Sequence, residues 1–222
     1  QLLAGAFTAP SGTLNVGGNV SIINRGNKGS AIVRLTGNAS GQTVTGQTGL
    51  YMPGLTIDTG SNAVTLVGNL NVSSHYTYVS SGTFTVTGNT LGLWCAYGTT
   101  CNITPGTVAY NNVAFSGHYT TINLGGGTMT IDGNLSFGDT YGAGYTTQPL
   151  NNGTLNVKGN IAVTSWGFRG TAVINALGGT GTTLGQPATA GFPTGTFTVN
   201  KDSVTDTMSL TSAITLYGTG QA

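Results

Sequence analysis

The chain has 222 residues, only 5% of them are charged, and its formal net charge is +1. This length fits one domain or one long repeat array, and so weak a charge cannot steer nucleic acid or an anionic membrane. Glutamate is absent while Thr, Val and Ile abound, so the composition predicts an all-β protein. No apolar run reaches the length of a membrane-spanning helix.

The first element that we expect is the motif GTLNVGGNVSI, residues 12–22. Apolar and polar residues alternate on both sides of its Gly18-Asn19 step, which predicts two short strands around a turn. A two-residue hairpin would pair apolar with polar residues throughout, so the alternation rejects it. Two arrangements remain: a three-residue hairpin over residues 17–19, or the corner of a β-solenoid. In such a corner Gly allows the bend, and the Asn side chains of successive coils stack as a ladder.

The same motif is repeated at residues 62–72, 82–92, 127–137 and 153–163. Consecutive marker asparagines are 19 to 31 residues apart, which suits one coil of a parallel β-helix, whereas hairpins of a sandwich have no reason to keep such a step. The spacing therefore favours the solenoid. The predicted corner asparagines are Asn19, Asn38, Asn69, Asn89, Asn112, Asn134 and Asn160.

We therefore predict a single parallel β-helix (β-solenoid) over residues 1–222, with about eight to nine coils. Loop insertions are expected near residues 41–54, 94–106 and 178–195, where Gly, Pro and Thr interrupt the strand pattern. The core is expected to contain Leu14, Val16, Leu70, Val72, Phe84, Val86, Ile131, Leu135, Leu155, Val157 and Ile161.

Strings such as GTLNVKGNIAV, GTFTVTGNTLG and YNNVAFSG resemble the repeats of large secreted bacterial surface proteins with β-solenoid stalks. These include filamentous-haemagglutinin-like adhesins and autotransporter passenger domains. The resemblance implies a right-handed parallel β-helix outside the cell, used as a stalk, a fibre or an adhesive surface. It carries over no catalytic residue.

The two cysteines, Cys95 and Cys101, lie in the string WCAYGTTC. Their spacing is not that of a metal site, and no further His or Cys pair follows. We expect a disulfide that closes a short loop; two free thiols would instead indicate a reducing compartment. With the low charge, the disulfide favours an extracellular or cell-surface location.

Groups suited to catalysis are scarce. The acidic residues are five aspartates, and the only close pair, Asp202 and Asp206, is either a cation ligand pair or a solvated strand edge. His75 and His118 each precede a tyrosine, and no G-x-S-x-G motif is present. We expect no enzyme activity, no metal and no cofactor. The scattered basic residues also argue against nucleic acid.

Two further surface patterns have ordinary explanations beside functional ones. Six Asn-x-Ser/Thr sequons occur, close to the chance number, and Asn102 and Asn152 in predicted loops are the best candidates for glycosylation. Paired threonines are similar to the rows on flat ice-binding solenoid faces, although Thr is also a common outward strand residue. The pairs are Thr83–Thr85, Thr128–Thr130 and Thr196–Thr198.

Two functions remain open from the sequence. The first is a non-catalytic extracellular fibre subunit or adhesin stalk that associates with itself, because the ends QLLAGAFTAP and SAITLYGTGQA are apolar and lack polar caps. Neighbouring domains of a longer chain are the alternative explanation of such ends. The second function is a carbohydrate-binding, or less readily carbohydrate-cleaving, β-helix that contacts surface glycans. Its sugar platforms would be Tyr76, Tyr78, Tyr110 and Tyr119.

Overall fold

The fold is a parallel β-solenoid, seen in a computed structural model. The structure describes residues 11–22, 30–37, 41–79, 82–85, 89–96, 98–117, 120–138, 148–164, 168–185, 192–193, 195–213 and 216–217. Within these residues every strand pairing is parallel and no helix is present, which confirms the all-β prediction. Accordingly, none of the described segments is a helix that could cross a membrane.

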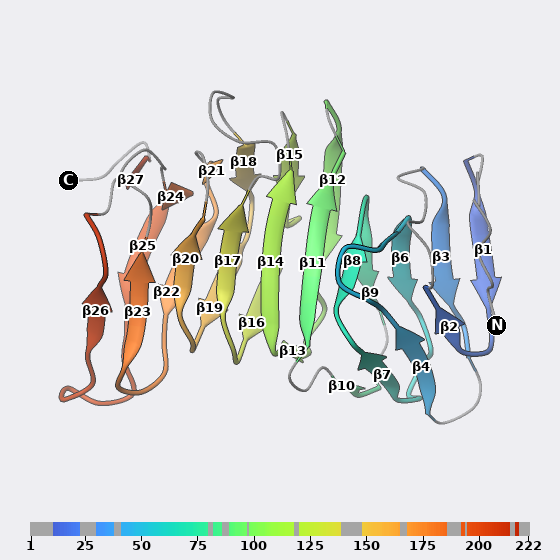
Figure 1. The fold of residues 1–222 in the computed structure, drawn as a ribbon, viewed down its shortest axis with the longest axis horizontal. Helices are drawn as coiled ribbons and strands as arrows, with labels where there is room; N and C mark the ends of the chain where they lie inside the picture. The colour runs from blue at the N-terminus through green and yellow to red at the C-terminus, as the bar shows by residue number, and fades with distance from the viewer. Residues whose placement is uncertain are drawn as a thin grey trace.

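The strands stack on three faces, which the chain visits in the order 1, 2, 3 in each turn (Figure 1). Face 1 consists of β1 (Thr13–Val16), β3 (Ile32–Leu35), β6 (Gly54–Ile57), β9 (Tyr76–Tyr78), β12 (Thr100–Thr104), β15 (Thr121–Asn123), β18 (Gln148–Asn151) and β21 (Phe168–Arg169). Face 3 consists of β5 (Tyr51–Met52), β8 (Leu70–Val72), β11 (Thr90–Cys95), β14 (Asn112–Gly117), β17 (Leu135–Gly138), β20 (Ile161–Val163), β23 (Thr182–Gly185) and β26 (Met208–Leu210).

Among the described residues, the strands of face 2 form two sheets. The first sheet holds β2 (Val20–Ser21), β4 (Gln42–Thr45), β7 (Val64–Val67) and β10 (Phe84–Thr85). The second sheet holds β13 (Ala109–Tyr110), β16 (Thr128–Ile131), β19 (Thr154–Val157), β22 (Val173–Ala176) and β25 (Thr196–Val199). A separate pair, β24 (Phe192–Pro193) and β27 (Leu216–Tyr217), lies near the last turn.

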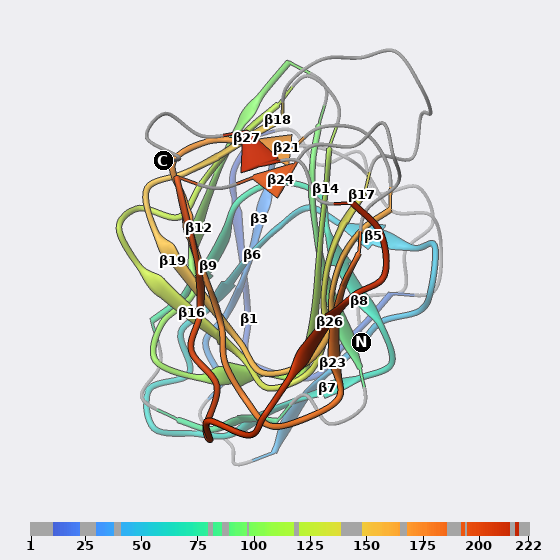
Figure 2. The ribbon, with the colours of Figure 1, turned by 90° about the vertical axis from the view of Figure 1, so that its left-hand side faces the viewer.

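The 21 strands from β3 to β23 make seven complete turns, three strands to a turn, with partial turns at both ends. The expected eight to nine coils is therefore roughly confirmed. Viewed along the stack, the turns superimpose as an elongated loop (Figure 2). The strand β1 lies at one end of the stack and β26 at the other (Figure 1).

The interior of the loop is one apolar cluster of inward side chains. Its middle contains Phe115 and Phe137, which stack at a ring-centroid distance of 5.8 Å. Of the expected core residues, eight are buried: Leu70, Val72, Phe84, Ile131, Leu135, Leu155, Val157 and Ile161. Leu14 and Val16 are only half-buried because β1 is an end strand, and Val86 lies outside the described residues.

The Gly-Asn steps form corners, and most of them join face 2 to face 3. There the Oδ1 atom of Asn112 accepts the N–H of Asn134 at 2.8 Å, and Asn134 accepts the N–H of Asn160 at 2.9 Å. Asn160 in turn accepts the N–H of Thr183. Each asparagine thus hydrogen-bonds the backbone of the next coil, so the ladder joins side chain to backbone.

The remaining predicted corner asparagines lie in different positions. Asn69 accepts the N–H of Thr90 in the same way. Asn19 does so for Thr43, but at the corner between faces 1 and 2. Asn89 is displaced by one residue, because Thr90 takes the place in register with Asn112, and its Nδ2 donates to a carbonyl oxygen instead. Asn38 lies outside the described residues.

The three ranges expected to be loop insertions contain strands. Residues 41–54 include β4 and β5, residues 94–106 include β12, and residues 178–195 include β23. Polar side chains at inward positions hide the alternation of apolar residues in two of these ranges. Gln42 is buried and its Nε2 donates to the carbonyl oxygen of Val16, while Thr182 is buried next to Leu184.

Candidate self-association site

The residues considered for chemistry do not converge. In the part of the chain that is described, no group of three His, Cys, Asp or Glu could hold a metal ion. The carboxylate of Asp206 accepts the N–H of Ser203 at 2.9 Å and the hydroxyl of Thr180 at 2.6 Å, so it ties together a turn. His75 accepts the N–H of Asn102 at its Nδ1 atom, 3.0 Å away, and His118 lies outside the described residues.

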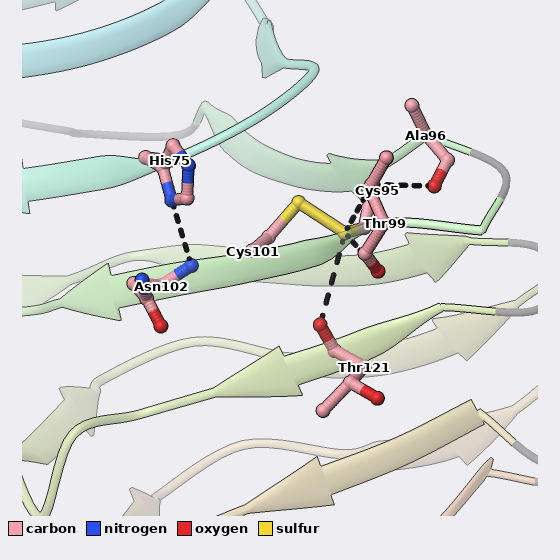
Figure 3. Close-up of a disulfide and its surroundings, with 7 residues drawn as sticks. All are labelled: His75, Cys95, Ala96, Thr99, Cys101, Asn102 and Thr121. Carbon is pink, nitrogen blue, oxygen red and sulfur yellow. Dashed lines mark hydrogen bonds between the residues drawn. A yellow bond between two sulfur atoms is a disulfide. The ribbon is translucent and has the colours of Figure 1, made fainter. Parts of the chain in front are cut away.

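The cysteine pair lies at the corner between faces 3 and 1 (Figure 3). Cys95 ends β11 and Cys101 lies in β12, with Cα atoms 5.9 Å apart and the two Sγ atoms at disulfide distance. Both residues are buried, and His75 and Asn102 lie beside them in Figure 3. The disulfide ties the end of one turn to the start of the next.

Removing the disulfide with Cys95→Ala and Cys101→Ala together is expected to lower the unfolding free energy by about 2 kcal/mol, the value for so short a loop. Urea unfolding of the variant and the parent measures the difference. Intact mass without reductant should also be about two daltons lower than with it, because the bond removes two hydrogens. A mass showing two free thiols would contradict the pairing.

The tyrosines considered as sugar platforms are inside the solenoid. Tyr76, Tyr78 and Tyr110 are all buried. The hydroxyls of Tyr76 and Tyr110 hydrogen-bond each other at 3.1 Å, and Tyr110 donates to the carbonyl oxygen of Pro105 at 2.6 Å. These three rings cannot contact a glycan, and Tyr119 lies outside the described residues. The alternation of Tyr76, Thr77 and Tyr78 was the sequence signal for inward rings.

These buried tyrosines predict an alkaline loss of stability. Burial raises the pKa of Tyr76 and of Tyr110 above the ordinary value of tyrosine, so the folded state keeps phenolic protons that the unfolded chain has lost. The unfolding free energy is expected to be level up to about pH 9 and to fall above about pH 10. Denaturant unfolding across this range measures the slope. The slope should be shallower in Tyr110→Phe, and an unchanged slope would contradict the assignment.

The two glycosylation candidates lie on the surface. Asn102 is exposed but belongs to β12, not to the loop that the sequence predicts, and Asn152 is exposed in the turn between β18 and β19. Both are connected to Asn123, which donates to Oδ1 of Asn102 and accepts from Nδ2 of Asn152, each at 3.3 Å. Their glycosylation stays a prediction.

The C-terminal turn exposes side chains whose positions are buried one turn earlier. Val199 in β25 is in register with Ala176, which is fully buried, yet Val199 is 54% exposed. Leu210 in β26 is in register with the buried Leu184, yet it is 65% exposed. Both residues continue core columns beyond the last turn that covers them. Among the described residues, no strand covers these two columns.

A tied turn lies beside these two columns, between β25 and β26. Besides the bonds of Asp206, the Nζ atom of Lys201 donates to the carbonyl oxygen of Leu177 and to the hydroxyl of Thr182, so the turn is fixed to the previous coil. At its tip Val204 is fully exposed. With Val199 and Leu210, it makes the apolar end surface, as we name these three residues.

The N-terminal end also has apolar residues that are less buried than their partners in the neighbouring turn. Leu14 and Val16 in β1 are in register with Val33 and Leu35, which are buried, but are themselves only half-buried. In the described part of the chain β1 pairs only with β3. Residues 1–10, the expected docking strand, lie outside the described residues.

Comparison with known proteins adds no relative. No protein-family model, no curated protein and no solved structure matches the chain. The function must therefore be argued from the structure itself.

Proposed function

We propose that the chain is a non-catalytic structural protein, an extracellular fibre subunit or adhesin stalk that associates with itself end to end. The observation that carries the proposal is the apolar end surface, where core columns of the solenoid continue into solvent. An open parallel stack offers both apolar side chains and strand edges to another chain.

The two ends are compatible with each other. The half-buried Leu14 and Val16 lie at one end and the exposed Val199 and Leu210 at the other, so a second copy would extend the same core. The described end strands β1, β2, β25 and β26 contain no charged residue. The end strands themselves therefore bring no charge into the contact, which removes one cost of association.

The extracellular location is part of the proposal and is supported by the disulfide. A disulfide persists where the surroundings are oxidising, as they are outside the cell. The resemblance of the repeats to secreted bacterial stalks points the same way. Since Tyr76, Tyr78 and Tyr110 are buried, the carbohydrate-binding alternative has lost three of its four proposed contacts.

Leu210→Lys is expected to weaken the association, because it places a charge in the middle of the contact. Sedimentation velocity over a range of concentrations, with negative-stain microscopy of the same samples, should show shorter assemblies than for the parent chain. Val79→Lys is the matched control, because Val79 is equally apolar and 58% exposed but follows β9 in the middle of the stack. Equal effects of the two variants, or a parent chain that stays monomeric at high concentration, would contradict the proposal.

Deleting residues 1–10 tests the other end. If these residues dock on the apolar end surface, the truncated chain should assemble less than the parent. A truncated chain that assembles as well as the parent would remove the N-terminal strand from the proposal. The exposed columns of β25 and β26 would then have to meet β1 directly.

A further inference from the structure

The outward side of face 2 differs from the rest of the surface in composition. Its strands alternate inward residues with outward residues that are half-buried or exposed. The outward positions of the described strands are mostly threonines and include no charged residue and no aromatic ring. These outward residues are Ser21, Thr43, Thr45, Thr65, Val67, Thr85, Ala109, Thr128, Thr130, Thr154, Asn156, Val173, Asn175, Thr196 and Thr198.

In the second sheet of face 2 these residues form two straight columns. Pairing without a break places Thr128, Thr154, Val173 and Thr196 in one column. The neighbouring column contains Thr130, Asn156, Asn175 and Thr198. Strands of a sheet lie about 4.8 Å apart, and alternate residues of one strand about 6.7 Å apart. The side chains therefore repeat in two dimensions on a scale of a few ångströms.

The array is held in a fixed geometry. Threonine and valine branch at Cβ, which restricts χ1, so each side chain has few orientations to lose on binding. The Nδ2 atom of Asn175 donates to Oδ1 of Asn156 at 2.9 Å, which fixes the two amides of the second column. Asp132 and Lys158 directly follow β16 and β19 at the corner next to the array, and they pair with each other at 2.7 Å.

The other two faces lack this combination. Face 1 carries Arg34, which forms an ion pair with Asp58, and a run of linked asparagines around Asn123. On face 3 the outward residues in register are mostly small ones, among them Gly92, Ala114, Ser136 and Ala162. Face 1 also has outward threonines in register, at Thr56, Thr77 and Thr104, but this column continues into Arg34. Among the described residues, face 2 differs in that its threonine columns contain no charge.

We propose that the outward threonine columns of face 2 bind the surface of ice. The occupant suggested by the array is a neutral lattice of hydrogen-bond donors and acceptors that repeats on the scale of single water molecules. A threonine hydroxyl donates one hydrogen bond and accepts others, and its methyl group adds apolar contact. Charged side chains would hold their own liquid hydration shell, and face 2 has none among its described outward positions.

Other occupants fit this face less well. A glycan site normally offers aromatic rings together with a few convergent polar groups, and the described outward positions of face 2 offer no ring. An anionic polymer requires basic residues, which are also lacking there. A second copy of the chain would have to desolvate a surface of hydroxyls and amides without a complementary charge. This site is independent of the two ends, so the proposal stands or falls separately from end-to-end association.

The test uses the full chain and three single variants, each first shown to be folded by its circular dichroism and unfolding midpoint. Thr154→Lys places a charge in the middle of the first column. Ser136→Lys places the same charge on face 3 and is the control. Val173→Thr completes the first column with little change in volume.

Thermal hysteresis and the shape of single ice crystals are measured by nanolitre osmometry, and fluorescently labelled protein is followed into growing ice. The parent chain is expected to shape crystals and to enter the ice. Thr154→Lys should lose most of the hysteresis, Ser136→Lys should keep it, and Val173→Thr should equal or exceed the parent.

Several outcomes would overturn the proposal. They are a parent chain excluded from ice without hysteresis, equal losses in Thr154→Lys and Ser136→Lys, or a marked loss in Val173→Thr. Binding to crystalline chitin or cellulose without ice activity would assign the face to a polysaccharide. A change of sedimentation coefficient in Thr154→Lys, again without ice activity, would assign it to a contact between copies.

Discussion

Gly159→Ala is expected to lose about 1–3 kcal/mol of unfolding free energy, the usual range for an atom forced into a packed site. A Cβ atom at Gly159 would lie 2.3 Å from the carbonyl oxygen of Gly133, one coil below. That oxygen accepts the N–H of Gly159 at 3.0 Å, so neither backbone can move away without breaking the contact between coils. The glycine of the repeated motif is therefore required because the backbones of stacked corners approach closely.

Gly18→Ala is the matched control, because Gly18 occupies the same position of the motif at the first corner. A Cβ atom there would meet nothing within 4 Å, and the φ of Gly18 is not in the left-handed region. Its substitution is expected to change the unfolding free energy by no more than about 0.5 kcal/mol. Guanidinium unfolding of both variants gives the comparison. Similar losses of unfolding free energy at the two positions would show that the glycine of the motif is not required by the stacking of corners.

Phe115→Ala is expected to cost about 3–5 kcal/mol, the range for removing a large buried ring. Phe115 is fully buried in β14, and its ring stacks on Phe137 of the next turn with an interplanar angle of 14°. Loss of the ring opens a cavity between two turns that the fixed spacing of the coils prevents from closing.

The controls for this variant are on the same strand and at the same site. Ser116→Ala changes the adjacent outward residue and should alter the unfolding free energy by less than about 0.5 kcal/mol. Phe115→Leu keeps most of the volume and should recover much of the loss. Equal destabilisation by Phe115→Leu and Phe115→Ala would mean that the ring's shape, and not the filled volume, stabilises the core.

The repeated motif and its spacing together predicted the solenoid: alternation on both sides of Gly-Asn left two arrangements, and the distance between copies favoured the solenoid. They could not tell which corner each copy occupies. The copy at residues 12–22 turns between faces 1 and 2, whereas the copies at residues 127–137 and 153–163 turn between faces 2 and 3. Alternation is the same at either corner, so only the pairing between coils distinguishes them.

The sequence analysis predicted that both ends of the chain are apolar and lack polar caps, but it did not predict which core residues are exposed there. From the sequence, Val199 and Leu210 are ordinary inward strand residues like Val157 and Leu184. Their exposure follows from the absence of a further turn over them in the described chain, which is a property of the stack and not of the local sequence. Conversely, the tyrosines were interpreted as surface rings because aromatic residues next to polar ones look amphipathic in a single segment.

The stacking of coils also has a consequence for how the chain folds. The hydrogen bonds of the asparagine ladder join residues 22 to 26 positions apart, so each turn is completed by a nearby piece of chain. Folding can therefore start at one turn and propagate to its neighbours in either direction. Among the described residues, β10 and β13 of face 2 belong to different sheets, while faces 1 and 3 continue through β9 to β12 and β11 to β14. Propagation of the stack past this position is therefore expected to rely on the pairings of faces 1 and 3.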